Sequence, residues 1–136
     1  MRITRAVEFS SSLRYVRPEL SADENRRLFG RAASSHGHNY RLEVTLAGEP
    51  DPRTGMVLDL KELKEILERE VVARFDHRDL VLDTPYFEKL VPTPENFACV
   101  LYRLLEAALP AGMLVAVRLH PDADGFVDVT APGPRA

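Results

Sequence analysis

The chain has 136 residues, enough for one domain with a hydrophobic core and too few for two. Hydrophobic residues make up 45% and charged residues 29%, which excludes the disordered and fibrous classes. The net charge is -3 and there is no basic block, so nucleic acid and anionic membranes are not expected partners. We expect a single domain over residues 1–136 that binds a small molecule.

No stretch of the sequence has the apolar length of a signal peptide or a membrane span, so we expect a cytoplasmic protein. The single cysteine, Cys99, excludes an internal disulfide, and its apolar helical surroundings predict a buried side chain.

Four segments have the pattern of β-strands. Residues 2–15 and 38–46 alternate polar and apolar side chains, which is typical of strands. Residues 113–120 and 126–129 form two more, joined by the turn sequence Asp122 to Gly125. Residues 16–35 have no sustained period and predict a long irregular connection. The Pro/Gly-rich end, residues 131–136, is expected to fray.

Two segments have the pattern of helices. Asp59 begins an apolar face of helical period that ends near Phe75, with Glu62 placed for a capping box. A second helix begins at its N-cap, Thr93, and stops at Pro110. The element order ββααββ lacks regular βα alternation. It predicts an α+β domain in which two helices cover one face of a four-stranded antiparallel sheet.

The triplet His36-Gly37-His38 is a candidate metal site. Residues i and i+2 of a strand point to the same side, so both imidazoles can face one ion. A His-x-His pair is nevertheless more often an ordinary surface pair, so its spacing alone does not assign it.

Two further pairs of residues also have both structural and functional interpretations. Asp76 and His77 stand at a predicted helix end, where such a pair is often only a favourable charge arrangement, and they are also a candidate proton-transferring pair. Thr93 and Glu95 open the second helix, where capping is at least as common as ligand contact.

Several stretches, in order and spacing, resemble the 6-pyruvoyltetrahydropterin synthase and 6-carboxytetrahydropterin synthase family over nearly the whole chain. These stretches are residues 36–40, 51–64, 76–80 and 92–96. The resemblance implies the tunnelling fold, in which subunits join their sheets into an oligomeric β-barrel, commonly a hexamer. It also implies a zinc-dependent lyase that acts on dihydroneopterin triphosphate in tetrahydropterin or queuosine biosynthesis.

In that family three His hold zinc, a Cys acts as general base with an Asp-His pair from a neighbouring subunit, and a Glu anchors the pterin. Carried over residue by residue, the resemblance implies three pairs: the metal ligands His36 and His38, the catalytic Asp76 and His77, and the substrate-binding Thr93 and Glu95.

Three positions depart from the family's pattern. Leu13 stands in place of the first zinc His, Ala32 in place of the Cys, and Pro121 in place of the anchoring Glu. Glu8 and His120 are poor substitutes, because each has the wrong strand parity to face the site unless a bulge intervenes. We therefore expect zinc to be weakly bound or absent, and whether the chain is an enzyme stays open.

Three functions are compatible with these observations. One is a protein degenerate in catalysis that keeps the homo-oligomer and holds a pterin or purine-like ligand between subunits. Another is an active zinc-dependent lyase with substitute residues. The third is a structural or regulatory partner of an active paralogue.

Overall fold

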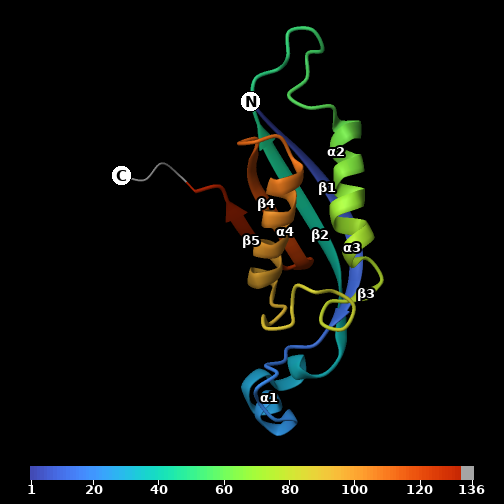
Figure 1. Ribbon diagram of the computed structural model, residues 1–136, viewed down its shortest axis with the longest axis vertical. Coiled ribbons are helices and arrows are strands. Elements are labelled where there is room, and N and C mark those ends of the chain that lie inside the picture. The colour runs from blue at the N-terminus through green and yellow to red at the C-terminus, as the bar shows by residue number, and fades with distance from the viewer. Residues whose placement is uncertain (133–136) are drawn as a thin grey trace.

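Four long strands form the centre of the fold in the computed structural model of the chain, which describes residues 1–132 (Figure 1). They are β1 (Arg2–Leu13), β2 (His36–Ala47), β4 (Leu114–Asp122) and β5 (Gly125–Thr130). Neighbours in the order β1-β2-β4-β5 pair antiparallel, which confirms the predicted sheet. The two-residue strand β3 (Arg78–Asp79) was not predicted; it pairs parallel with the end of β1 and makes the sheet five-stranded and mixed. Most of the end segment expected to fray lies outside the described residues.

Two helical segments cover one face of this sheet (Figure 1). The first consists of α2 (Leu60–Leu67), a π-helical stretch (Glu68–Val72) and α3 (Ala73–Phe75), so the predicted end near residue 75 is confirmed. The second is α4 (Pro94–Ala108). Asp59 caps the first helix by accepting from the Lys61 N–H, and Thr93 caps the second by accepting from Asn96.

The prediction of an irregular connection between β1 and β2 is wrong. This segment contains the helix α1 (Ala22–Phe29) and a 3-10 turn (Gly30–Ala33). Ser21 and Glu24 form a complete capping box at the start of α1. The buried Asn25 accepts from the Arg17 N–H and donates to three carbonyls of residues 17–21. These contacts hold residues 14–35, here called the α1 loop, in a defined form at the end of the sheet (Figure 1).

The core between the sheet and the helices is centred on aromatic rings. Phe9 on β1 stacks on Tyr40 of β2, with ring centroids 5.2 Å apart. Phe97 of α4 meets both rings edge-on, at 5.9 and 5.2 Å, and is completely buried. The prediction that Cys99 is buried is wrong. Its side chain is exposed on the solvent side of α4, whereas the preceding Ala98 faces the core.

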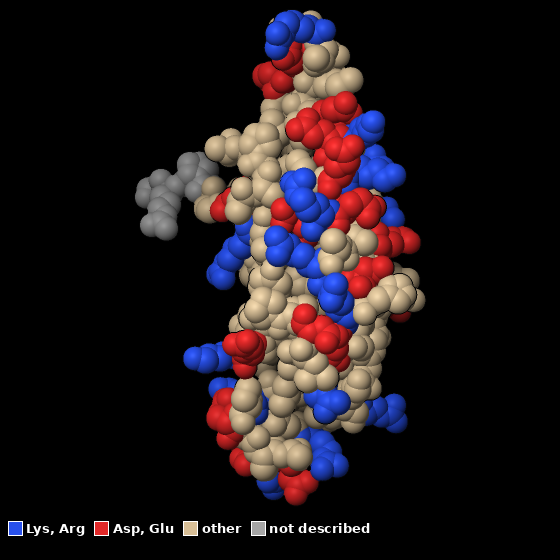
Figure 2. Space-filling view, turned by 45° about the vertical axis from the view of Figure 1, so that its right-hand side comes forward, with Lys and Arg blue, Asp and Glu red and all other residues tan. Residues whose placement is uncertain are grey.

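Charged residues of both signs are interspersed on the surface, as Figure 2 shows for one face. This distribution agrees with the absence of a basic block from the sequence. Within residues 1–132, no helix is long and apolar enough to cross a membrane.

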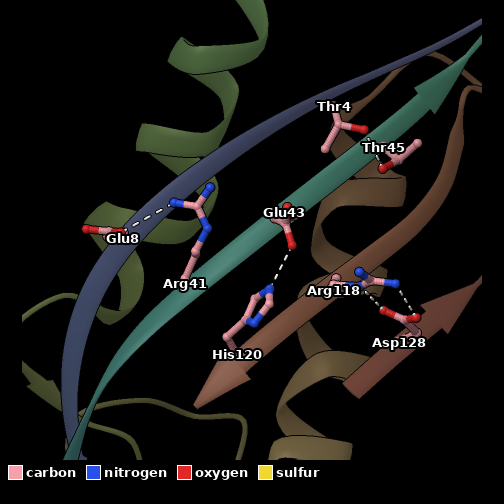
Figure 3. A network of polar contacts seen from close by, with 8 residues as sticks. All are labelled: Thr4, Glu8, Arg41, Glu43, Thr45, Arg118, His120 and Asp128. Carbon is pink, nitrogen blue, oxygen red and sulfur yellow. Dashed lines mark hydrogen bonds and ion pairs between the residues drawn. The ribbon is translucent and has the colours of Figure 1, made fainter. Parts of the chain in front are cut away.

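The opposite face of the sheet, here called the helix-free face, carries polar cross-strand pairs (Figure 3). These are Glu8 with Arg41 (3.4 Å), Glu43 with His120 (2.7 Å), Arg118 with Asp128 (2.8 and 3.0 Å) and Thr4 with Thr45 (2.8 Å). An antiparallel sheet with one packed and one solvated face has this alternation of apolar and polar side chains.

The aromatic core makes Phe97 a sensitive position. We expect Phe97→Ala to lower the free energy of unfolding by about 3–5 kcal/mol, because it removes a buried ring and leaves a cavity. Urea denaturation followed by circular dichroism, at one protein concentration, measures this. Phe126→Ala is the control: Phe126 is 52% exposed, and its loss should cost less than about 1 kcal/mol. Equal effects of the two changes would contradict this description of the core.

Candidate functional site

The pairing of β1 with β2 places Leu13 opposite His36 and Ser11 opposite His38. Residues directly opposite each other in an antiparallel pair point to the same face, with Cβ atoms about 4.5–5.5 Å apart. Leu13 is 0% exposed. An apolar side chain therefore fills the position next to the imidazole pair from which β1 could offer a third ligand.

The two imidazoles are part of a continuous row of rings that runs from the α1 loop into the core. Its members, here called the ring series, are Phe29, Tyr15, His36, His38 and Tyr40. Successive centroids lie 5.8, 5.9, 5.4 and 5.5 Å apart, all in edge-to-face geometry. Tyr40 joins the series to the aromatic core through its contacts with Phe9 and Phe97.

The polar surroundings of the two imidazoles differ. Nδ1 of His36 lies 2.8 Å from the Ser34 carbonyl, which can only accept, so Nδ1 is the donor in this contact. Burial, assisted by His36, lowers the pKa of His38, while the charge of Asp122 opposes this shift. The His38 ring is thus held toward its neutral form.

A zinc ion does not fit the donors present. Among the described residues, no group of three or more His, Cys, Asp or Glu side chains could hold a metal ion. The two alternative ligands, Glu8 and His120, lie on the helix-free face and bond to Arg41 and Glu43 (Figure 3). Durable zinc sites have three or four protein ligands. His36 and His38 alone do not make one.

Ala32 lies where the resemblance predicts a general base. Its carbonyl accepts from the Tyr15 N–H at 2.7 Å, which places it beside the ring series. Its methyl side chain has no atom that can accept a proton.

Asp76 and His77 form an ordered pair directly after α3. Oδ1 of Asp76 accepts from the Ser10 N–H at 2.9 Å, and Oδ2 contacts Nδ1 of His77 at 2.9 Å. The Ser10 N–H, and then His77, lower the pKa of the Asp76 carboxyl. His77 has φ 57°, in the left-handed region, and its N–H donates to the Ser10 carbonyl at 2.7 Å. Its side chain is 84% exposed, so the ring presents Nε2 to solvent.

This pair lies on the other side of β1 from the imidazoles. Asp76 lines a hollow of about 350 Å³ together with Glu8, Asn39 and Arg41, whose side chains belong to the helix-free face. His36 and His38 point, like Tyr40, to the helix side. His77 and His38 nevertheless both line a second hollow, of about 480 Å³, so one chain brings a member of the predicted catalytic pair and one predicted metal ligand to a common surface.

Thr93 and Glu95 have separate roles at the start of α4. Oγ1 of Thr93 accepts from the Asn96 N–H at 3.2 Å, so its hydroxyl is a helix cap, one of the two interpretations that the sequence allowed. Glu95 is exposed. The pKa of Tyr15 is raised first by the burial of its own side chain and second by the negative charge of Glu95. Its carboxylate is thus close enough to act on the ring series.

Asp122 is a residue near the site that sequence reasoning assigned only to a turn. The structure includes it in β4, and its charge acts on the ring of His38. No sequence motif marks it, because its position depends on how β4 pairs with β5.

Comparison with known proteins agrees with this architecture. Residues 2–131 match the family model described as 6-pyruvoyl tetrahydropterin synthase. The chain is 40% identical over 128 residues to 6-pyruvoyl tetrahydrobiopterin synthase of Pongo abelii, covering 93% of this chain and 88% of that protein. It is 30% identical over 114 residues to 6-carboxy-5,6,7,8-tetrahydropterin synthase of Rickettsia typhi, covering 72% and 75%.

Among solved structures, 6-pyruvoyl tetrahydropterin synthase of Caenorhabditis elegans superposes with a TM-score of 0.89 at 32% identity, covering 97% of this chain and 96% of that one. With the family model matched over almost the whole length, the chain belongs to the 6-pyruvoyl tetrahydropterin synthase family.

Proposed function

We propose that this chain binds a pterin-type ligand between subunits and has lost the zinc-dependent lyase chemistry that the resemblance implies. The observation that carries the proposal is Leu13, fully buried opposite His36 and on the same face as both imidazoles. A leucine has no lone pair to offer a metal ion. Ala32, beside the same rings, likewise offers no base.

The features that suit a flat ligand are still present. The ring series offers aromatic edges and faces, and planar rings pack favourably against such surfaces. Glu95 adds a negative charge that acts on Tyr15, whose pKa is raised by burial and by this charge. A pterin or purine-like heterocycle meets both requirements, with Thr93 and Glu95 as its predicted contacts at the start of α4.

The Asp76 and His77 pair supports a site that is completed by a second subunit. The carboxylate fixes Nδ1 of His77, so Nε2 is the ring atom free to exchange a proton with a bound molecule. Because the His77 ring is exposed beside the hollow that it shares with His38, a second copy of the chain can enclose a ligand against this atom.

The sheet has the geometry for such an assembly. Beyond the short contact with β3, the outer edge of β1 is open, and β5 forms the other edge. The four long strands alternate in direction, so β5 of one copy can pair antiparallel with β1 of the next copy. When several copies pair in this way around a ring, the sheets close into a barrel without free edges. We propose this as the route to the homo-oligomer, a hexamer if two rings stack.

A second candidate is an active synthase. It is favoured by the 40% identity to a protein named as 6-pyruvoyl tetrahydrobiopterin synthase and by the presence of His36, His38, Asp76 and His77. This function needs a proton acceptor other than residue 32. A regulatory partner of an active paralogue would keep the same assembly.

The metal content of the protein tests the role of Leu13. We expect the wild type to retain little zinc after dialysis against a mild chelator. Leu13→His should retain close to one zinc per chain, because it adds an imidazole opposite His36. Elemental analysis measures both, and Leu13→Asn is the control for a polar residue at this position. Stoichiometric zinc in the wild type would reveal a ligand outside the set described above.

The assembly is tested at the edge of β5. Ala131 donates its N–H to the Val115 carbonyl, so by alternation the N–H of Asp128 points away from β4, toward the open edge. Light scattering at micromolar concentration should show an oligomer for the wild type and a smaller species for Asp128→Pro, which lacks this N–H. Asp128→Ala also loses the ion pair with Arg118 but keeps the N–H, and should assemble normally. A monomeric wild type would refute the assembly.

Activity separates the two candidate functions. We expect no turnover of dihydroneopterin triphosphate by the wild type and measurable turnover by the double variant Leu13→His/Ala32→Cys. A positioned general base is worth about 10²–10⁴-fold, so Leu13→His alone should bind zinc and stay nearly inactive. Product analysis by chromatography measures this. Wild-type turnover above that of the double variant would favour the active synthase.

A further inference from the structure

The helical segment that leads to Asp76 contains the π-helical stretch Glu68–Val72 between α2 and α3. Four residues of this segment are completely buried at a constant spacing of four: Leu63, Leu67, Val71 and Phe75. A regular α-helix has about 3.6 residues per turn, so side chains at this spacing would drift away from the core. The wider π turn compensates for the drift and keeps the last two of them on the buried face.

The π-helical stretch places Glu70 in a partly buried position, with a side chain that is 14% exposed. Oε2 of Glu70 accepts twice from Arg74, from Nη2 at 2.7 Å and from Nε at 3.1 Å. Oε1 accepts from Nε of Arg69 at 3.2 Å. The bonds from Arg74, and then those from Arg69, lower the pKa of the Glu70 carboxyl. The carboxylate is therefore held in its charged form between two arginines.

Arg74 also reaches the chain segment that follows β3. Its Nη1 donates to the Tyr86 hydroxyl at 2.9 Å, and the Tyr86 ring packs on Phe75, with centroids 5.5 Å apart. Arg74 thus closes a loop over residues 75–86, here called the β3 loop, which contains His77 and β3 and lies beside β1 (Figure 1).

The brace, as we call Glu70, Arg74 and Tyr86, holds the β3 loop from the side opposite to β1. On the side of β1, the Phe75 carbonyl accepts from Oγ of Ser11 at 2.7 Å. An ion pair that is partly buried loses hydration of both charges, which offsets much of its attraction, so the brace is a weak source of net stability. Its specific effect is orientation, because the planar guanidinium fork bonds the carboxylate and the hydroxyl in one fixed geometry.

We propose that the three residues of the brace are positioning residues, which hold the ring of His77 on Asp76 with Nε2 free to face the hollow of about 480 Å³ that His77 lines. The backbone of His77 is in the left-handed region, a conformation that persists only where the surrounding structure enforces it. The inference rests on the proposed function where it concerns a ligand, since it assumes that Nε2 meets a bound molecule. The state of the ring can be measured without any ligand.

The tautomer of His77, the choice of the ring nitrogen that carries the proton, tests the brace. Because the Asp76 carboxylate can only accept, a neutral His77 ring held on it is protonated at Nδ1. Nitrogen NMR of histidine-labelled protein, at a pH where the rings are neutral, distinguishes the two tautomers, and His77→Asn identifies the signal. We expect the Nδ1–H form to dominate in the wild type. Its ratio to the Nε2–H form should fall by about two- to tenfold in Arg74→Met and in Tyr86→Phe.

Arg69→Met is the matched control. Arg69 bonds to the same carboxylate, whereas the bond to Tyr86 comes from Arg74, so this variant should keep the wild-type tautomer ratio. Tyr86→Phe keeps the ring that packs on Phe75 and loses only the hydroxyl, so it guards against a variant that fails to fold. An unchanged ratio in both Arg74→Met and Tyr86→Phe would overturn the positioning role. An equal change in Arg69→Met would overturn it too, since any loss of charge beside Glu70 would then suffice.

Pterin binding separates this inference from the proposed function. Fluorescence titrations with pterin should show a loss of affinity of about two- to tenfold for Arg74→Met and Tyr86→Phe and no loss for Arg69→Met. A wild type that binds no pterin, with tautomer ratios that change as expected, would overturn the proposed function and support the brace. Unchanged pterin affinity in a wild type and variants that all bind would overturn the link between the His77 ring and the ligand.

Discussion

The register of β1 against β2 determines the rest of the site. The two strands pair without interruption from Arg2 opposite Ala47 to Leu13 opposite His36. A slip of one residue would turn every side chain of β1 to the other face, so the burial of Phe9 against Tyr40 holds the whole ladder in place. Leu13 consequently meets the imidazole pair by the same geometry that builds the core. The register therefore fixes the residue opposite His36, and it is a leucine where the resemblance implies a zinc His.

Most of the fold could be predicted because its main elements follow hydrophobic period and local capping. Thr93 and Asp59 mark the two long helices correctly. The helix α1 was missed, although its capping residues Ser21 and Glu24 are visible in the sequence, because the segment lacks an apolar stripe and is held instead by the buried amide of Asn25. The strand β3 has only two residues and exists through its pairing with β1, which no local pattern can indicate.

The site was predictable to the extent that alternation along a strand decides it. His36 and His38 share a face, and Glu8 and His120 point away from them, as parity indicated. Asp122 could not be found in this way. Simple alternation along β4 predicts that Pro121 faces the helix side. The pairing with β5 shows an irregularity between Leu119 and Asp122, where β4 has one residue more than β5, so that Asp122 lies opposite Gly125.

Under the proposed function, recognition and chemistry depend on different parts of this fold. The proposed ligand contacts lie on β2 and α4, whose core residues Tyr40 and Phe97 pack edge-on against each other. Two of the three positions that depart from the family's pattern lie elsewhere, Leu13 at the end of β1 and Ala32 in the α1 loop. His77 keeps its left-handed backbone, which costs about 1–3 kcal/mol, through its bonds with Ser10 and Asp76, independent of any metal. Leu13 and Ala32 are therefore compatible with the proposed loss of catalysis in a protein that keeps the ring series and the ordered pair of Asp76 and His77.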